Sequence, residues 1–412
     1  MSNFTLPLGI ESLEITAQTL DGQGNIIFDV KSNKTSTMCR ICGKSISKVH
    51  GHGEVLTIQH LPILDQPVFL RIRVVRYQCL DCDDHPTTAE RYDWMERKAK
   101  TTKGFDRYIN RQLIHSTVKD VSRKEKMSYE IVESALQRRV KKDVDWTHYT
   151  ELTTLGIDEI ALRKGHNAYV VIVSAKNKMG KLSIIGVLPN RLKETVKTFL
   201  ESIPESLKKT VNSVCTDMCD SFVQSACEIF GERVVVIDRY HVSKLYREPL
   251  DRLRISEMKR LKNILPPEEY TRLDNMMWIV RKKHECLSDV EKNQLALLYK
   301  HSPKLKEMHC AALKLTHIFN THQNRKRALT KLSRWIAAIQ KSGLSEFDGF
   351  IKTLTKYKAT ILNYFKERKN SGFVEGLNNK IKVLKRRCYG VFKTDTLFQR
   401  LFLDLQGYEV FS

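Results

Sequence analysis

The sequence contains no run of about 18 or more apolar residues, the length that an α-helix needs to cross a bilayer. Its first residues, Met-Ser-Asn-Phe-Thr-Leu-Pro-Leu, lack the basic flank and apolar core of a signal peptide. No internal repeat and no low-complexity linker is visible. These absences argue against a membrane-spanning or repeat protein, and we expect a soluble, intracellular chain.

Acidic residues are too few to balance the basic ones: 47 Asp and Glu stand against 70 Lys and Arg, and the net charge is +23. A field of this sign favours a polyanionic partner, either nucleic acid or an anionic membrane surface. The length of 412 residues suggests roughly two to four domains, each able to bury an ordinary core.

Cysteine is too sparse for a disulfide scaffold, with 10 in the chain, but four of the cysteines form two Cys-x-x-Cys pairs. In a reducing compartment such pairs indicate a metal before a disulfide. Four thiolates suffice for a closed, structural Zn²⁺ site. The predicted ligands are Cys39, Cys42, Cys79 and Cys82. The 36-residue loop between the pairs is longer than in compact zinc modules. The alternative ligands are His50, His52, His60 and His85.

The first part of the chain predicts strands and then a helix-turn-helix. Residues 12–31 alternate apolar and polar side chains around Asp21-Gly22, which indicates a β-hairpin, and residues 68–77 form another extended run. A short helix from Val118 and a longer one over 129–140 flank a break, and Ser128 is a good N-cap. This order is typical of DNA-binding helix-turn-helix units, although a plain helical linker would look similar. The predicted DNA contacts are Ser128, Tyr129, Gln137, Arg138 and Arg139.

The middle of the chain predicts an α/β sheet. Five strands are expected, over 152–158, 167–174, 181–187, 211–217 and 233–238, with helices over 191–203 and 221–230. The order β-β-β-α-β-α-β describes one open mixed sheet with helices against it. Residues from about 245 to 365 are helical throughout and indicate an all-α insertion.

Three of the expected strands end in an acid: Asp158, Asp217 and Asp238. The fourth strand should lie parallel to the first, about 4.8 Å away, so Asp158 and Asp217 would emerge together at the carboxyl edge. Two carboxylates there, with a third acid, could hold two Mg²⁺ ions. Asp238 is a weaker ligand candidate, one strand further out. Glu159, Asp220 and Asp238 stay open as alternatives, as does a purely structural role in helix caps or lysine pairs.

Two later motifs belong to this argument. Asp238-x-x-His241 follows the fifth strand, and His241 could contact the scissile phosphate or fix the edge of the site. A late helix, opened by Ser371-Gly, carries Glu375 and then five Lys or Arg in the eight residues from Lys380 to Arg387. Glu375, Asn379 and Lys382, at i, i+4 and i+7, would share one face. Glu375 is the predicted third acid, although a solvated charged helix would look similar. The predicted phosphate-gripping residues are Asn379, Lys380, Lys382, Lys385, Arg386 and Arg387.

These motifs together resemble the ISL-three family of bacterial insertion-sequence transposases, over nearly the whole length. The matching motifs are the two cysteine pairs, the helix-turn-helix around Ser128, Gly156-Ile-Asp158-Glu159, Thr216-Asp217-Met218, Val236-Ile-Asp238-Arg-Tyr-His241, and Ser371-Gly-x-Val-Glu375-Gly-x-Asn-Asn379-Lys-Ile-Lys382 with Arg386, Tyr389 and Gly390. One departure is Val75-Arg-Tyr-Gln-Cys79, where the family often has Arg-Arg-Phe-x-Cys; an aromatic still lies beside the cysteine.

The resemblance implies an RNase H-like α/β core of the DDE class. It implies a catalytic triad of Asp158, Asp217 and Glu375, and an accessory motif of Asp238 and His241. It also implies N-terminal modules that bind terminal inverted repeats. We expect a zinc-binding β domain over 1–95, a helix-turn-helix over 96–148, a core over 149–245 and 367–412, and an all-α insertion over 246–366.

The expected activity is Mg²⁺-dependent cleavage at transposon ends and strand transfer into target DNA. We expect a bacterial, cytoplasmic, nucleoid-associated protein that binds double-stranded DNA and is at least a dimer when it pairs two ends. The rival functions are a decayed or domesticated DNA-binding protein without cleavage, and a cellular nuclease that cuts but does not join.

Overall fold

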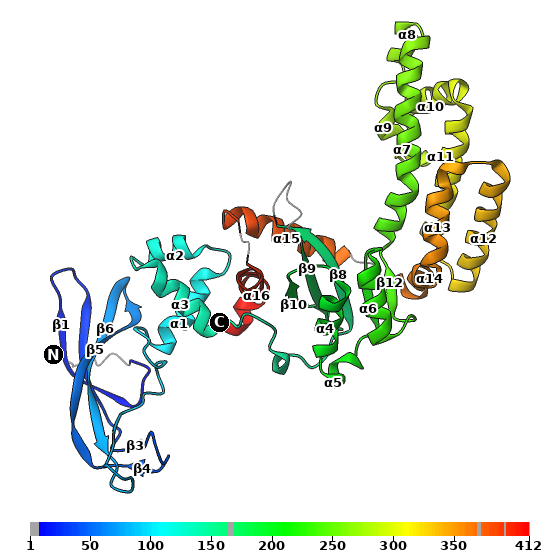
Figure 1. The fold of residues 1–412 in the computed structure, drawn as a ribbon. Helices are drawn as coiled ribbons and strands as arrows, with labels where there is room; N and C mark the ends of the chain where they lie inside the picture. Colours follow the sequence, from blue (N-terminus) through cyan, green and yellow to red (C-terminus); the bar gives the residue numbers. More distant parts are fainter. Residues whose placement is uncertain (1–7, 163–168, 369–371, 391–392, 412) are drawn as a thin grey trace. The chain divides into compact units, whose positions relative to one another are not determined.

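The computed structural model describes residues 8–162, 169–368, 372–390 and 393–411 (Figure 1). The chain forms two compact units. The first consists of Met1–Lys142, Leu384–Tyr389 and Gln399–Ser412, and the second of Asp143–Val383 and Gly390–Phe398. Ser371, which the sequence suggested as a helix start, lies outside the described residues.

The first unit contains a five-stranded sheet. Its strands are β1 (Leu13–Leu20), β2 (Ile26–Ser32), β5 (Val49–Ile63), β6 (Gln66–Gln78) and β7 (Thr87–Ala89), in the order β1-β2-β6-β5, with β7 on β6. β1 and β2 pair antiparallel, which confirms the predicted hairpin. In the first half of β6 every second residue, namely Val68, Leu70 and Ile72, is buried, because alternate side chains of a strand face the same side. A two-stranded sheet, β3 (Thr37–Met38) and β4 (Ser45–Ile46), flanks the first cysteine pair.

Three helices follow in the same unit: α1 (Lys103–Leu113), α2 (Val118–Lys124) and α3 (Tyr129–Arg139). Each begins at a hydroxyl side chain that accepts a backbone N–H of its first turn: Thr102, Thr117 and Ser128. The predicted N-cap at Ser128 is therefore confirmed. Apolar residues of the three helices form one core that also includes Leu403 and Phe411 of α16 (Thr394–Phe411).

The second unit is built on the predicted mixed sheet. Its strands are β8 (Thr154–Ala161), β9 (Tyr169–Lys176), β10 (Leu182–Leu188), β11 (Ser213–Thr216) and β12 (Val235–Ile237), in the order β10-β9-β8-β11-β12. β8, β9 and β10 form an antiparallel meander, and β11 runs parallel to both β8 and β12. The predicted placement of the fourth strand beside the first is confirmed.

Helices cover both faces of this sheet. The connecting helices are α4 (Lys193–Ser202), α5 (Glu205–Lys208) and α6 (Asp220–Phe230). The ring of Phe199 on α4 packs at Gly186 of β10, where a Cβ would lie 2.6 Å from it. The opposite face is covered by α15 (Gly372–Arg387), whose Phe373 and Val374 pack at Gly156 of β8.

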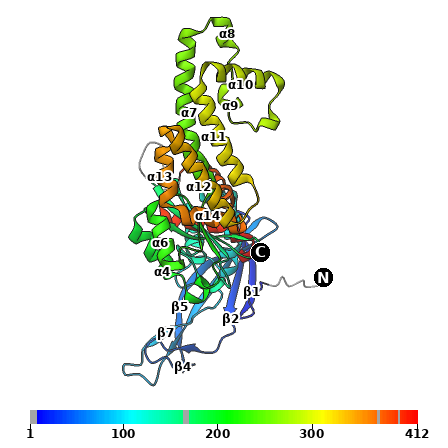
Figure 2. The ribbon, with the colours of Figure 1, turned by 90° about the vertical axis from the view of Figure 1, so that its right-hand side faces the viewer.

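The helical insertion is confirmed, although its first helix starts directly after β12. The helices are α7 (Arg239–Ile264), α8 (Pro267–Thr271), α9 (Met276–Ile279), α10 (Asp289–His301), α11 (Pro303–Asn320), α12 (Arg325–Ser342), α13 (Asp348–Lys356) and α14 (Lys358–Glu367). The short 3₁₀ segments are η1 (Trp146–His148), η2 (His284–Cys286) and η3 (Ser345–Phe347). Figure 2 shows α11 beside α7, and α12 to α14 gathered near the base of α7.

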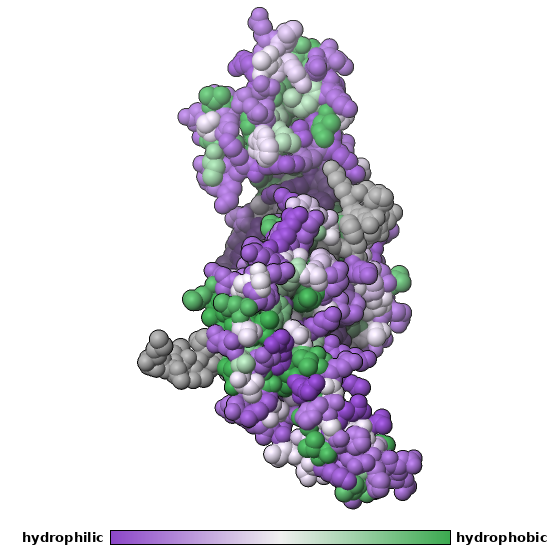
Figure 3. All heavy atoms as spheres, turned by 90° about the vertical axis from the view of Figure 1, so that its left-hand side faces the viewer, coloured by the Kyte–Doolittle hydropathy of each residue, from purple (hydrophilic) through white to green (hydrophobic). Residues whose placement is uncertain are grey.

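No helix within the described residues is long and apolar enough to cross a membrane. The face drawn in Figure 3 is mainly hydrophilic, with apolar side chains in separate patches.

Candidate active site

The three predicted acids lie at neighbouring positions on the sheet. Asp217 directly follows β11, whereas Asp158 lies within β8, which continues to Ala161 and does not end at Asp158 as predicted. The parallel register pairs Ile157 with Thr216, so the two aspartates are the next residues along on adjacent strands. Thr216 also pairs with Ile237, which places Asp238 in the same row one strand further out. The sequence prediction of a row of three acids is confirmed.

Asp217 is the member of this row whose protonation is most affected by its surroundings. Burial raises the pKa of its carboxyl above the usual value. The backbone N–H of Cys219, 2.9 Å from Oδ1, and the nearby His241 lower the pKa, while the charges of Asp158 and Glu159 raise it. An ionised Asp217 is thus costly in this place unless a positive charge approaches it.

Helix α15 is held against the same edge by two features of β8. Gly156 has no side chain, and a Cβ there would lie 2.4 Å from Val374 and 2.9 Å from Phe373. Asp158 lies two residues after Gly156 in β8, and its Oδ2 accepts a hydrogen bond of 2.6 Å from the amide Nδ2 of Asn378 in α15. The lack of a side chain at Gly156 lets the helix approach closely, and Asn378 fixes its position relative to Asp158.

Glu375 precedes Asn378 by three residues, so both lie on neighbouring parts of one helix face. Asn378 is partly buried on Asp158, whereas Glu375 is exposed. Asn378 is not among the residues predicted from the sequence. The sequence feature that could have identified Asn378 is its position three residues after Glu375, which places both side chains on the same part of the helix surface.

The remaining residues of α15 divide into a buried and an exposed stripe. Val374, Leu377, Ile381 and Leu384 are buried. The predicted shared face is confirmed as the exposed one, which carries Glu375, Asn379, Lys380, Lys382 and Arg386.

Two of the predicted phosphate-gripping residues differ from this exposed group. Arg387 forms an ion pair with Asp404 of α16, and its side chain is 22% exposed. Its guanidinium neutralises a mostly buried carboxylate, which gives Arg387 a structural role, and its contact with DNA stays a prediction. Lys385 is half-buried, and burial lowers the pKa of its ammonium group.

The alternative acids have other partners. Asp220 accepts hydrogen bonds of 2.6 Å from both Lys356 and Tyr357, which tie α6 to the end of α13. Glu159 pairs with Arg191 at 3.1 Å. Asp238 is buried and caps α7, since its Oδ1 accepts the N–H of Tyr240. Glu159 and Asp220 are thus each paired with a cation of the protein, whereas Asp158 and Asp217 accept hydrogen bonds from N–H groups.

The carboxylates are less tightly grouped than the cysteines. Among the described residues, the only group whose ligand atoms all lie within 4.8 Å of one another is Cys39, Cys42, Cys79 and Cys82. Asp158, Asp217 and Glu375 do not form so tight a set. A two-ion site does not require one, because its ligands are divided between ions about 3.5–4 Å apart.

The four predicted cysteines meet at one point. The Sγ–Sγ distances are 3.9 Å for Cys39–Cys82, 3.7 Å for Cys42–Cys79 and 3.6 Å for Cys79–Cys82. Sulfurs about 2.3 Å from a tetrahedral Zn²⁺ lie about 3.8 Å apart, so the quartet fits that ion. Backbone N–H groups of Cys42 and Ile41 lower the pKa of the Cys39 thiol to about 6, which favours a thiolate ligand.

The four histidines that were alternative zinc ligands lie in other surroundings. His60 is buried between Thr102 and the carbonyl of Leu8, at 3.0 Å from each. His85 lies 3.3 Å from the carbonyl oxygen of Cys79. His50 and His52 are exposed on β5. The cluster of four cysteines could bind zinc without any of them.

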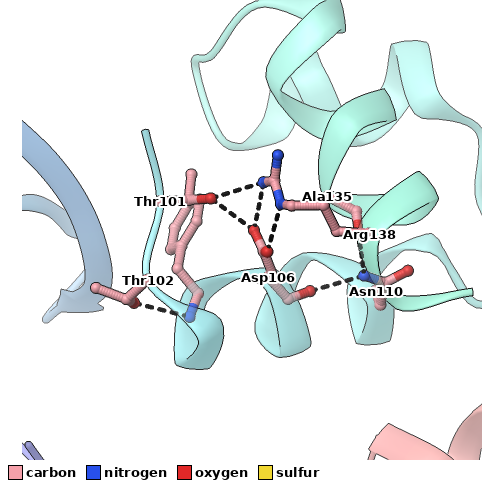
Figure 4. Close-up of polar contacts among 7 residues, drawn as sticks. Thr101, Thr102, Asp106, Asn110, Ala135 and Arg138 are labelled. Carbon is pink, nitrogen blue, oxygen red and sulfur yellow. Dashed lines mark hydrogen bonds and ion pairs between the residues drawn. The ribbon is translucent and has the colours of Figure 1, made fainter. Parts of the chain in front are cut away.

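Arg138 has an internal role within the helix-turn-helix. Its Nε and Nη2 donate to the carboxylate of Asp106 at 2.7 Å, and Nη2 also donates to Thr101 (Figure 4). Asn110 adds bonds from its Nδ2 to the carbonyls of Asp106 and Ala135. These contacts fasten α3 to α1. Arg138 thus has a structural role, because a buried Asp106 requires a positive partner, and its contact with DNA stays a prediction.

The other predicted residues of α3 are more accessible. Ser128, Tyr129 and Gln137 are exposed, and Arg139 is half-buried. The side of α3 that includes Val132, Ala135 and Leu136 is buried in the core. The exposed side is the one that can approach a DNA groove.

Helix α16 closes the open end of this helix-turn-helix. Gln399 donates to the carbonyl of Val140 at 2.6 Å, and buried Arg400 donates to the carbonyls of Leu113 and Ser116. These side chains satisfy carbonyls at the C-terminal ends of α1 and α3. Sequence reasoning assigned residues 367–412 to the catalytic core, whereas the structure packs residues 399–411 in the first unit.

Two protein-family models match this chain, one over the sheet with its acidic edge and one over the helix-turn-helix. A family model described as a transposase, of the DDE type of family ISL3, matches residues 155–401. A second model, described as the helix-turn-helix domain of transposase family ISL3, matches residues 90–140.

Two curated relatives cover most of the chain. The transposase for insertion sequence element IS1001 of Bordetella parapertussis is 25% identical over 365 residues, 88% of this chain and 87% of the relative. The transposase for insertion sequence element IS1557 of Mycobacterium tuberculosis is 22% identical, over 97% of this chain and 93% of the relative. The first family model alone spans more than half of the chain, together with the sheet, its acidic edge and α15. The chain belongs to the ISL3 family of DNA transposases.

Proposed function

We propose that this transposase uses Asp158, Asp217 and Glu375 to cut DNA at the ends of its insertion element and to join the ends to target DNA. In the first step, water attacks the phosphodiester at the element end and a 3′-hydroxyl is released. In the second step, that hydroxyl loses its proton and attacks a target phosphodiester, whose own 3′-oxygen leaves. Both are in-line displacements at phosphorus and need the same charge stabilisation.

One observation carries the proposal: the parallel pairing of β8 with β11 places Asp158 and Asp217 side by side at the edge where α15 is fixed. Carboxyl edges of parallel strands are common positions for sites in α/β sheets. Gly156 allows α15 to approach, and Asn378 holds Asp158, so Glu375 is carried by a helix with a defined position at this edge.

The donor set suits Mg²⁺, which binds carboxylate oxygens in preference to nitrogen or sulfur. The raised pKa of Asp217 fits such a role, since a cation would offset the cost of ionising a buried acid beside two others. Bound Mg²⁺ would lower the pKa of the attacking water and stabilise the leaving oxygen. Asp158, Asp217 and Glu375 would hold it, while His241, close enough to Asp217 to lower its pKa, would contact or orient the phosphate.

DNA recognition would be divided between two helices. The proposed contacts on α3 are Ser128, Tyr129, Gln137 and Arg139, and those on α15 are Asn379, Lys380, Lys382, Lys385 and Arg386. Exposed bases on α15 would neutralise phosphates close to Glu375 and make binding strongly dependent on salt. The cysteine quartet would hold a structural Zn²⁺ in the first unit.

Further features follow from this function. A mixed five-stranded sheet with helices on both faces and acids at one edge supports an RNase H-like core. We propose separate zinc-binding and helix-turn-helix domains within the first unit, and a core interrupted by the insertion within the second. Pairing two element ends requires at least a dimer on DNA, and the substrate is on the bacterial nucleoid.

The test uses labelled DNA that carries the terminal inverted repeat of the encoding element, with Mg²⁺, and measures binding, cutting and joining together. Asp217→Asn should bind DNA as the wild type does but cut no more than background. Asp220→Asn is the matched control, because Asp220 binds Lys356 and Tyr357 and should be dispensable for cutting.

Full cleavage by Asp217→Asn would remove that residue from the site. Binding without any cutting by the wild-type chain would favour a DNA-binding protein, and cutting without joining would favour a nuclease.

A further inference from the structure

A strongly basic cavity of about 510 Å³ lies within the helical insertion, between α7, α11 and residues 280–283. Five cations and one carboxylate contribute to its lining. They are Arg239, Arg247, Arg281, Lys282, Lys283 and Asp251. Aliphatic residues such as Leu250 and Leu313 supply part of the remaining wall. Cationic groups and an apolar wall in one cavity suit a ligand that is anionic in one part and apolar in another.

The cations of this cavity are not all neutralised by the protein. Arg281 pairs with Asp251, and Lys282 pairs with Glu291. The side chains of Arg247 and Lys283 have no hydrogen-bond or ion-pair partner anywhere in the described part of the chain.

Arg239 is a third available charge. Its guanidinium donates to Asn320 and to the hydroxyl of Tyr364, which are both uncharged partners. The cavity therefore retains an excess of positive charge that a bound anion could neutralise.

The cavity begins beside the acidic edge of the sheet. Arg239 follows Asp238 directly, and the pairing of Thr216 with Ile237 places Asp238 on the strand next to the one that Asp217 follows. From Arg239 to Asp251 the helix rises about 18 Å, at about 1.5 Å a residue. Phosphates on one strand of duplex DNA are spaced about 3.4 Å along the axis, so this distance corresponds to about five nucleotides.

We propose that this cavity binds the phosphate backbone of the DNA strand that flanks the scissile phosphate, with Arg247 and Lys283 as its main contacts. The inference rests on the proposed function, because it continues the substrate path from Asp217 along α7. DNA fits better than an acidic protein, since the charge excess starts at the row of acids where the phosphodiester would be cut. The aliphatic wall would lie against a sugar or base.

The test pairs changes in the protein with changes in the DNA. The variant Arg247→Ala/Lys283→Ala removes two charges that have no internal partner, so the fold should be unaffected. Lys259→Ala/Lys352→Ala is the matched control, because both lysines are exposed on the insertion, are absent from the cavity lining and have no partner among the described residues. Neutral methylphosphonates replace single phosphates within about six nucleotides of the cleavage site of the labelled element end.

The cavity variant should bind the end about tenfold more weakly near 0.1 M salt, and the slope of log K against log salt should fall by up to about 1.8. Methylphosphonates at the contacted positions should weaken wild-type and control binding but have no further effect on the cavity variant. Cutting by the wild-type chain is scored in the same reactions, so failure of the proposed catalysis would be visible separately.

Equal affinity and equal methylphosphonate sensitivity in the cavity variant and the control would overturn the proposal. A cavity variant that binds DNA normally but loses self-association in sedimentation would also overturn it and assign the cavity to a protein partner.

Discussion

At the scale of single residues, the contact between Asn378 and Asp158 is the most informative. A carboxylate that binds a cation must be held in one orientation, and an amide that donates to one of its oxygens provides this. We expect Asn378→Ala to reduce DNA cutting by about 10–100-fold, the usual effect of removing a group that orients a metal ligand. Binding of element-end DNA should be unchanged, because Asn378 is partly buried against the sheet.

Asn379→Ala is the matched control for this prediction. Asn379 is the next residue, is exposed, and has no contact with Asp158. The control should affect DNA affinity more than the rate of cutting at saturating DNA. If Asn379→Ala slows cutting at saturation as much as Asn378→Ala does, Asn378 has no special role in orienting Asp158.

A second residue-scale prediction concerns pH and His60. Burial lowers the pKa of this imidazole, which lies between the hydroxyl of Thr102 and the carbonyl of Leu8. The unfolded chain binds a proton at His60 near pH 6.5, whereas the folded chain does so only at lower pH. The contribution of neutral His60 to the free energy of unfolding is therefore fully present above the pKa of His60 in the unfolded chain. It is lost as the pH falls through the lower pKa of His60 in the folded chain.

The measurement is the thermal midpoint of the full chain between pH 7 and pH 5, followed through the first unit. His60→Gln should show a smaller loss on acidification than the wild type. His52→Gln, exposed on the same strand, should behave as the wild type does. Equal slopes in all three proteins would show that His60 is protonated without cost.

At the scale of elements, the fit between β8 and α15 depends on the absence of a side chain at Gly156. A Cβ there would lie 2.4 Å from Val374 and 2.9 Å from Ser174, and neither atom can move freely in the core. We expect Gly156→Ala to lower the free energy of unfolding by about 1–3 kcal/mol, the typical cost of overpacking. The rate of DNA cutting should fall even under conditions in which the variant remains folded, since α15 carries Glu375.

The control lies on α15 itself. Nothing lies within 4 Å of the position that a Cβ would take at Gly376, so Gly376→Ala should stabilise the helix by about 0.5–1 kcal/mol. Denaturant unfolding gives the stability and labelled DNA gives the activity. A Gly156→Ala protein with normal stability and cutting would mean that α15 does not need this close approach.

The elements also show what a sequence can predict. The strands next to Asp158, Asp217 and Asp238 were predictable because a short apolar run beside an acid is a local feature, although the continuation of β8 to Ala161 was not predicted. The paired roles of Arg138 and Arg387 were not, since a basic residue on a charged helix looks the same whether it faces solvent or a buried acid. Asn378 was missed because its contact depends on the packing of α15 on β8, which no local pattern encodes.

Packing between residues far apart in the chain could not be predicted from the sequence either. The pattern of α16 is apolar on several sides, which is compatible with burial in either unit. Its contribution of Leu403 and Phe411 to the core around α1 and α3 depends on pairing residues nearly 300 positions apart. The cysteine quartet, in contrast, was predictable across its 36-residue loop because thiolate pairs have few other uses in a reducing compartment.

At the scale of the molecule, the two units should respond differently to loss of metal. The cysteine quartet joins the β3–β4 region to the end of β6, and an exposed ion pair between Lys44 and Asp81 also connects the two Cys-x-x-Cys turns. We expect about one Zn²⁺ per chain. A chelator should then increase amide exchange within residues 37–89 and leave the sheet of residues 154–188 protected.

Hydrogen exchange with and without chelator measures this difference. Cys82→Ser should lose the zinc and reproduce the effect, whereas Cys286→Ser, exposed in the insertion, should keep it. Increased exchange in both units, or in neither, would contradict a structural zinc confined to the first unit.

The packing of residues 399–411 against α1 and α3 has a consequence for synthesis of the protein. A ribosome releases the helix-turn-helix long before it makes Leu403 and Phe411, so part of its core faces solvent until these residues have been made. The carbonyls of Leu113 and Val140 also lack their hydrogen-bond donors, Arg400 and Gln399, until these residues have been made. The core of the helix-turn-helix therefore becomes complete only after the sheet, the insertion and the helix with Glu375 have been made, and a chain that stops before residue 399 lacks these contacts.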